Sequence, residues 1–354
     1  MMRIDARLPT SVGVWLAVAC ALGADASESA AAELEGYRYQ QVHMGMPVEV
    51  VLYAPDSAAA NKAADAAFAR FHQLDAVLSD YNPASELSRL SASAGSRRAV
   101  PLSDDLWTVL VHAQQLAAAT EGAFDVTVGP ATKLWRRARR EREFPSAERL
   151  AEARAAIGYQ ALVLDELSHK ATLTRPGMRL DVGGIAAGYA VDEALRVLRE
   201  HGITRAMVDA SGDIGVGDAP PGKRGWTLGV VPEGGRDNKP LRYLLLANAA
   251  VTTSGDAFQH VEFNGQRYSH IVDPHTSLGL STRCSATVIA PDCITADSLA
   301  TAVCVLGPEK GIDFIEHHSN TAALITTATD GPARLIESSR FGRFAAATGV
   351  PGTK

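Results

Sequence analysis

The chain has 354 residues, of which 46% are hydrophobic, and a formal net charge of -6. It is long enough to bury a large core, as one big domain or as two merged ones. The acidic balance, with no Lys/Arg block outside residues 136–142, argues against a nucleic-acid partner. Because that basic run alternates with Glu141 and Glu143, it is predicted to be a solvated helix face: Arg136, Arg137, Arg139, Arg140 and Arg142.

The N-terminus is typical of an export signal. Arg3 and Arg7 precede an apolar run over residues 12–22, and Ala24-Asp25-Ala26 supplies a small-x-small cleavage pattern. We therefore predict a signal peptide over residues 1–26 and a mature chain over 27–354. Two alternatives stay open: a buried N-terminal helix, and lipid attachment at Cys20, which Ala17-Val18-Ala19 precedes.

The first half of the mature chain is predicted to contain one long strand and several amphipathic helices. The strand, residues 37–53, places Val48, Val50 and Leu52 on one face. Met44-Gly45-Met46-Pro47 interrupts it, where a bulge or a close ligand approach is expected. The other elements are helices at 61–78, 104–120 (capped by Ser103) and 146–157, a helical turn at 85–90, a strand-like link at 122–130 into a helix through Trp135, and strands at 161–164 and 171–173.

The second half is predicted to be richer in strands. They fall at residues 205–209, 225–231, 241–247, 250–253, 268–272 and 285–290, with a strand pair around 330–331, a helix at 295–306 ended by Gly307-Pro308, and a helix from about residue 309. Strands and helices alternate irregularly, with several hairpins. This order predicts an α+β fold rather than a doubly wound sheet.

Three cysteines remain after cleavage at Ala26: Cys284, Cys293 and Cys304. Their odd count and irregular spacing fit neither a disulfide framework nor a zinc site. Cys304 lies in an apolar helical stretch and is predicted to be a core residue. A bridge between Cys284 and Cys293 stays open, because export places the protein in an oxidising compartment.

Residues 180–192 are the stretch around which the rest is organised. Leu180 and Asp181 are predicted to end a short strand, Gly183-Gly184 to turn tightly, and an amphipathic helix to follow. A glycine turn before a helix N-terminus directs unpaired N–H groups outward, which makes an anion site. The alternative is a glycine pair that only allows close packing.

Asp297 and Thr301 are four residues apart on the predicted helix, so their oxygens lie on one helix face. A carboxylate and a hydroxyl are hard ligands that suit Mg²⁺, which takes few protein ligands and fills its octahedron with water and phosphate oxygens. The alternative is an acidic residue near the helix dipole beside a core threonine.

His270 is predicted to share one face of the strand at 268–272 with Tyr268 and Val272. A histidine with an ordinary pKa can accept a proton from a hydroxyl nucleophile. The alternative is a strand histidine that a neighbouring backbone carbonyl satisfies. Nearby, residues 252–256 (Thr-Thr-Ser-Gly-Asp) suit a close ligand approach or a plain hairpin turn equally well.

Taken together, these motifs resemble the ApbE family of flavin transferases. The matching pieces stand in family order over most of the mature chain: Met44-Gly45; Leu78-Ser79-x-Tyr81 with Ser85-Glu86-Leu87; Gly122-Ala123-Phe124-Asp125-x-Thr127-x-Gly129-Pro130; Asp181-x-Gly183-Gly184-Ile185-Ala186-x-Gly188-Tyr189-Ala190; Gly212-Asp213; Thr253-Ser254-Gly255; His270-Ile271-x-Asp273-Pro274-x-Thr276; and Ala296-Asp297-x-x-Ala300-Thr301. The resemblance implies an ApbE-like, T-fold-type α+β fold with mixed sheets and packed helices, in a single large domain.

The resemblance also implies a role for each matching residue. Asp297, Thr301 and the backbone carbonyl of Gly184 would hold Mg²⁺, and His270 would be the catalytic base. The FAD site would be lined by Met44, Tyr81, Ala123, Phe124, Asp125, Asp181, Ala187 and Val272. Ala187 stands where the family usually has Lys or Glu, so one polar contact to FAD is lost; Met46 and Ser277 also depart from the usual Thr and Gly.

The implied activity is that of an FAD:protein FMN transferase. FMN would pass from FAD to a threonine of an acceptor protein, in a membrane redox complex on the periplasmic side, and AMP would be released. Two rivals are an FAD pyrophosphatase that gives FMN and AMP, and a non-enzymatic FAD-binding protein. The expected location is the periplasm or the extracytoplasmic face of the inner membrane.

Overall fold

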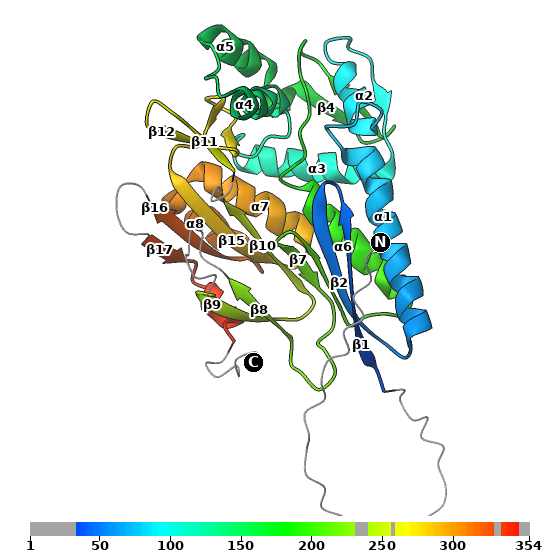
Figure 1. Ribbon diagram of the computed structural model, residues 1–354. Helices are drawn as coiled ribbons and strands as arrows, with labels where there is room; N and C mark the ends of the chain where they lie inside the picture. The colour runs from blue at the N-terminus through cyan, green and yellow to red at the C-terminus, as the bar shows by residue number, and fades with distance from the viewer. Residues whose placement is uncertain (1–32, 231–239, 256–258, 329–333, 347–354) are drawn as a thin grey trace, which may run out of the picture.

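The computed structural model describes residues 33–230, 240–255, 259–328 and 334–346 (Figure 1). The predicted signal peptide and Cys20 lie outside the described residues. Within the described part, no helix combines the length and apolarity needed to cross a membrane.

An eight-stranded sheet forms the centre of the molecule, and every neighbouring pair in it is antiparallel. In spatial order its strands are β1 (Glu35–His43), β2 (Met46–Ala54), β6 (Ala206–Ala210), β7 (Asp213–Val216), β10 (Ala249–Gly255), β15 (Arg283–Ala290), β16 (Ala322–Ala328) and β17 (Arg334–Glu337). An antiparallel sheet with separate helices confirms the predicted α+β class.

Strand alternation gives this sheet two apolar faces. Val48, Val50 and Leu52 pack in the main core, beneath four helices: α1 (Ser57–Leu78), α6 (Ala186–Glu200), α7 (Cys293–Leu306) and α8 (Pro308–His317). Val51 points to the opposite face, where Trp226 from the hairpin of β8 (Trp226–Val230) and β9 (Arg242–Leu246) covers a smaller cluster. Residues with period-two spacing thus divide between two cores, as the pleat requires.

A second group of elements packs beyond one end of the main sheet (Figure 1). It contains a small sheet, several helices and two hairpins: β3 (Val100–Pro101), β4 (Leu162–Asp165), β5 (Lys170–Leu173), α2 (Glu86–Ala92), α3 (Asp104–Ala119), α4 (Gly129–Glu141), α5 (Ala147–Ala156), β11 (His260–Phe263) with β12 (Gln266–Ser269), and β13 (Val272–Asp273) with β14 (Leu278–Gly279). Trp135 from α4 is buried in the cluster that joins these helices to the hairpins.

Two predicted strands take a different form. The strand at residues 37–53 is a hairpin, because Met44 (φ 50°) and Gly45 (φ 76°) form a two-residue turn and His43 pairs with Met46. The stretch before Gly183 is not a strand, since only an isolated bridge joins Arg179 to Val128.

The three described cysteines, Cys284, Cys293 and Cys304, are free and buried. The bridge between Cys284 and Cys293 that the sequence left open is therefore not formed. The prediction that Cys304 lies in the core of its helix is confirmed.

Helices α6 and α7 approach each other closely near the N-terminus of each. Asp192 on α6 accepts the backbone amides of Cys293 and Ile294, both at 2.8 Å, and so caps α7 from outside. At Gly188, a Cβ would lie 2.3 Å from the Cys293 carbonyl oxygen and 2.8 Å from Asp297 Cβ. The absence of a side chain at Gly188 is what lets the two helices meet.

We predict that Gly188→Ala lowers the free energy of unfolding by about 1–3 kcal/mol, because the added methyl forces α6 away from the α7 backbone. Gly342→Ala is the matched control, since a Cβ at Gly342 meets nothing within 4 Å. Urea unfolding of both variants checks the prediction. Equal stabilities for G188A and the wild type would contradict it.

Candidate active site

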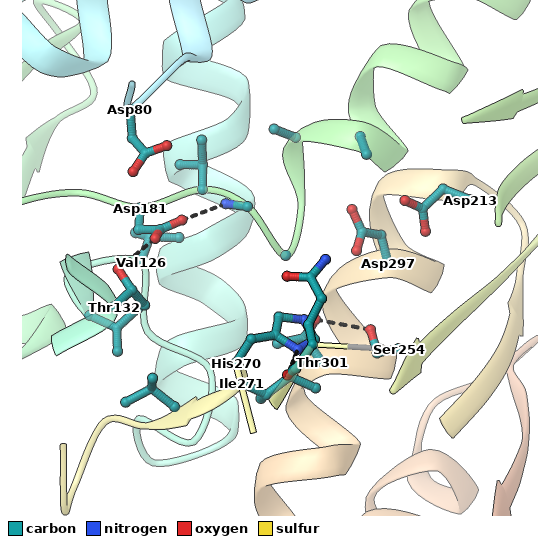
Figure 2. A pocket seen from close by; sticks show the side chains of 18 of the residues that line it. Asp80, Val126, Thr132, Asp181, Asp213, Ser254, His270, Ile271, Asp297 and Thr301 are labelled. Atoms are coloured by element: carbon teal, nitrogen blue, oxygen red, sulfur yellow. Dashed lines mark hydrogen bonds between the residues drawn. The ribbon is translucent and has the colours of Figure 1, made fainter. Parts of the chain in front are cut away.

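A cleft of about 1470 Å³ lies where the end of the main sheet meets the second group of elements. Figure 2 shows side chains from both parts facing into it. All twelve residues selected from the sequence line this cleft: Met44, Tyr81, Ala123, Phe124, Asp125, Asp181, Gly184, Ala187, His270, Val272, Asp297 and Thr301. The structure thus brings the set together; the role of each residue stays a prediction.

One wall of the cleft joins the glycine turn to α7. A Cβ on Gly184 would lie 2.8 Å from Thr301 Oγ1, so this backbone segment rests directly on the threonine. The Thr301 hydroxyl is also 3.2 Å from Ser254 Oγ on β10. Asp297, one helical turn before Thr301, accepts the Gly188 amide on Oδ2 at 3.1 Å.

That last hydrogen bond changes the start of α6. In a regular helical turn the Gly188 amide would donate to the Gly184 carbonyl, four residues earlier. It donates to Asp297 instead, and no backbone amide of the described residues donates to the Gly184 carbonyl. The Gly184 carbonyl oxygen is therefore left without its helical donor, in a backbone segment that lies against Thr301, one helical turn after Asp297.

The electrostatics of this wall are unbalanced. Burial is the main cause of the raised pKa of Asp297, which is about 7. The hydrogen bond from the Gly188 amide has the opposite effect and lowers this pKa. Burial, followed by the charges of Asp297 and Asp209, raises the pKa of Asp213 well above its ordinary value. No Lys, Arg or His among the described residues forms an ion pair with Asp213 or Asp297.

These features fit a hard divalent cation. Three oxygen donors of different kinds, the Asp297 carboxylate among them, with Asp213 as a second carboxylate without a counter-charge nearby, match the preference of Mg²⁺ for few protein ligands and several waters. The site is not a cluster of three or more His, Cys, Asp or Glu side chains, and none of that kind occurs in the described ranges.

The glycine turn supplies fewer outward amides than the sequence predicted. The Gly183 amide donates to Asp181 Oδ1 at 2.9 Å, and the Ile185 and Ala186 amides donate to the Val182 carbonyl. The amides of Gly183, Ile185, Ala186 and Gly188 are thus satisfied inside the protein. The close packing weighed as an alternative describes this turn better than an anion site built of N–H groups.

The opposite wall is organised by Arg136 on α4. Its Nη2 donates to Asp181 Oδ2 at 2.8 Å, its Nη1 pairs with Asp80, and its guanidinium carbon lies 4.4 Å from the centroid of the Tyr81 ring. The prediction of a solvated face is wrong for Arg136, whose side chain is only 28% exposed. It holds for Arg137 and Arg140, which are more exposed and pair with Glu141.

The carboxylates on this wall have fixed partners. Thr132 donates its hydroxyl to Asp181 Oδ2 at 2.7 Å (Figure 2). Asp125 is buried and accepts both the amide and the hydroxyl of Thr127 at 2.7 Å, although burial raises its pKa. Both groups shape the cleft through these bonds before any ligand enters it.

The remaining lining residues are mainly apolar. Ala123, Phe124, Ala187 and Val272 are buried, whereas the Tyr81 ring is 75% exposed. Met44 reaches the cleft from the β1–β2 turn, where its positive φ and that of Gly45 reverse the chain. An open aromatic ring above an apolar floor is a surface that suits a flat heterocycle.

His270 lies between two hairpins rather than within one strand, which corrects the predicted strand at 268–272. The Ser269 amide donates to Leu280, while the His270 amide donates to Gln259 at 2.9 Å, so the chain leaves β12 before it enters β13. The His270 Nδ1 lies 3.1 Å from the Gln259 carbonyl oxygen. A carbonyl only accepts, so this contact places the proton on Nδ1 and the lone pair of the neutral ring on Nε2.

Sequence reasoning missed several polar residues of the cleft, among them Asp213, Arg136, Asp80 and Thr132. Asp213 stood in a matching motif but was given no role, and Arg136 was assigned to solvent; Asp80 and Thr132 were not considered. Only Asp213 carried a usable signal, its place in the Gly212-Asp213 pair. The other contacts join residues 45 or more positions apart.

Comparisons with known proteins agree with this architecture. Residues 44–325 match the family model described as the ApbE family. A Haemophilus influenzae protein named FAD:protein FMN transferase is 32% identical over 76% of this chain and 79% of its own length. An Escherichia coli K12 protein of the same name is 30% identical over 73% of this chain and 76% of its own length.

Solved structures give the same result. The flavin transferase ApbE from Vibrio cholerae superposes with a TM-score of 0.79 at 28% identity, over 88% of this chain and 99% of that one. The apo form of the Pseudomonas stutzeri flavinyl transferase ApbE gives 0.78 at 29% identity, over 88% and 97%. Because the ApbE family model matches residues 44–325, most of this chain, the chain belongs to the ApbE family.

Proposed function

We propose that this protein transfers the FMN moiety of FAD to a threonine hydroxyl of an acceptor protein, in a Mg²⁺-dependent reaction that releases AMP. The observation that carries the proposal is that one cleft holds a hard-oxygen donor set, at Gly184, Asp297 and Thr301, together with His270. The relatives from H. influenzae and E. coli are named FAD:protein FMN transferase, which supports the same reaction.

The cleft suits a dinucleotide in size and lining. Its volume of about 1470 Å³ exceeds the roughly 300–1,000 Å³ of sites for drug-sized ligands. The exposed Tyr81 ring, backed by Arg136, offers a stacking surface for a flat ring. The donor set on the other wall would then lie near the diphosphate.

Mg²⁺ would be held by the Gly184 carbonyl, the Asp297 carboxylate and the Thr301 hydroxyl. When bound, it supplies charge neutralisation to the diphosphate and to the departing AMP. The protein's part is to hold these donors in place: Gly188 orients Asp297 through its amide, and Ser254 lies within hydrogen-bond distance of the Thr301 hydroxyl.

His270 acts as the base. With its proton on Nδ1 beside the Gln259 carbonyl, Nε2 accepts the proton of the acceptor threonine. The threonine oxygen attacks the phosphorus of the FMN half, the bond from that phosphorus to the bridging oxygen breaks, and AMP leaves with the bridging oxygen. The product is a phosphoester between FMN and the acceptor.

The acceptor and the location belong to the same proposal. The pattern of residues 1–26 supports export, which would place the reaction in the periplasm or at the extracytoplasmic face of the inner membrane. The acceptor would then be a periplasmic part of a membrane redox complex. Lipid attachment at Cys20 would add a membrane anchor.

Incubating the protein with FAD, Mg²⁺ and candidate acceptors tests the proposal. We expect one acceptor threonine to gain the mass of FMN, with one AMP released for each acceptor modified. Mass spectrometry with nucleotide chromatography gives both readouts. Rapid FMN release without acceptor modification would favour a pyrophosphatase, and unchanged FAD would favour a flavin carrier; either contradicts the proposal.

His270→Ala is expected to slow transfer by about 10²–10⁴-fold, because the variant lacks the base that accepts the threonine proton. FAD affinity, measured by fluorescence quenching, should stay close to that of the wild type. His260→Ala is the control, since His260 lies on β11, is exposed and does not line the cleft. Undiminished transfer by H270A would remove His270 from the mechanism.

Thr301→Val and Thr301→Ser form a matched pair at the metal donor set. Valine keeps the shape and removes the hydroxyl, so T301V should need at least about 10-fold more Mg²⁺ for half-maximal transfer. T301S keeps the hydroxyl and should stay near the wild type. Rates measured over a Mg²⁺ series check this, and equal requirements for T301V and T301S would exclude the hydroxyl as a ligand.

A further inference from the structure

Asp213 is a carboxylate of the cleft that the proposed reaction has not used. It begins β7, directly after the tight β6–β7 turn at Ser211 (φ 58°) and Gly212 (φ 103°). Its register partner on β6 is Ala210, which packs in the main core on the helix-covered face of the sheet. Asp213 therefore lies where the end of the main sheet borders the cleft, on the face of the sheet that α7 covers.

Figure 2 shows the Asp213 carboxylate next to that of Asp297. The two groups interact electrostatically and both line the cleft. No hydrogen bond or ion pair of the Asp213 side chain is found within the described residues. Asp297 is buried and Asp213 half-buried, so two carboxyl groups share a partly desolvated place, which is costly for their charged forms unless a cation lies near.

A second polar group lies near the start of β7. The pairing of β7 with β10 ends at Val251–Ile214; Thr252 follows Val251 on β10, and Asp213 precedes Ile214 on β7. Thr252 is 0% exposed, and among the described residues its hydroxyl has no hydrogen-bond partner. A buried hydroxyl without a partner is rare and calls for an explanation of its own.

One arrangement explains both groups. Mg²⁺ usually keeps several waters, and their hydrogens point away from the ion toward acceptors in the next layer. We propose that Asp213 is an outer carboxylate of the metal site, which accepts a hydrogen bond from a metal-bound water; the Thr252 hydroxyl, which bonds to no described residue, Asp213 included, is a further polar group that a water of this layer would satisfy. This inference rests on the magnesium site of the proposed function and adds to it a positioning residue.

Asp209 is a nearby carboxylate that does not have the position required of an outer carboxylate of the metal site. It lies on the same β6–β7 hairpin, and its charge also acts on Asp213. Strand alternation places it on the opposite face from Val208 and Ala210, and its Oδ1 accepts the Gly212 amide at 2.8 Å. Asp209 therefore has the same charge and a similar location without access to the α7 side of the sheet.

Calorimetric titration of Mg²⁺ into the full-length protein, with FAD present, tests the proposal. Asp213→Asn should weaken Mg²⁺ binding by about 10–100-fold, the loss typical of outer-layer partners of metal sites. Asp209→Asn should bind Mg²⁺ as the wild type does.

Thermal melting supplies a second readout. In EDTA, D213N should melt at least as high as the wild type, because it lacks the carboxylate that crowds Asp297. Added Mg²⁺ should then raise its melting temperature less than that of the wild type. A purely structural Asp213 would give a lower melting temperature in EDTA. If D213N does not fold, Asp213→Ser, a smaller side chain, is measured in the same way.

The outcomes separate this inference from the proposed function. Wild-type affinity in D213N, or an equal loss in D213N and D209N, overturns the role of Asp213 and leaves the transferase proposal intact. A wild-type protein that binds no Mg²⁺ overturns the magnesium site itself, and this inference with it.

Discussion

The contact between the N-terminal ends of α6 and α7 is the constraint on which the cleft depends. Gly184 rests against Thr301 and Gly188 against the start of α7, at distances that no side chain would allow. The same contact turns the Gly188 amide toward Asp297 and leaves the Gly184 carbonyl without its helical donor. Packing between two helices thus creates the donor set, so stability and chemistry depend on the same glycines.

The two walls of the cleft balance their buried acids in different ways. Asp181 and Asp80 share the guanidinium of Arg136, so a protein cation lies between them, although burial and the charge of Asp181 still raise the pKa of Asp80. Asp297 and Asp213 have no such partner among the described residues, and burial raises the pKa of both. The first wall is complete in the absence of ligand, whereas the second is suited to a cation from solution.

The sequence predicted what short-range chemistry determines. Ser103 caps α3 as expected, and alternation placed Val48, Val50 and Leu52 on one face correctly. It failed where distant segments decide the outcome. The Arg136 pairs form across 45 and 56 residues, and His270 takes its amide partner from Gln259 on a separate stretch of chain. Residue spacing carries no information about such contacts, whereas the residues chosen from the family motifs line one cleft.

Ala187 supports the proposal of a metal on the α7 wall, because it supplies no charged side chain there. The resemblance predicted Lys or Glu at this position, whereas this chain has a buried methyl group. The Lys and Arg side chains that line the described cleft are Arg136 and Arg139, both on α4. A diphosphate beside Asp297 and Asp213 would meet carboxylates without a protein cation, and the Coulomb repulsion in a partly desolvated cleft would oppose binding. On the proposed function, a cation held by the α7 wall would offset this repulsion, so the affinities for substrate and for metal would be interdependent.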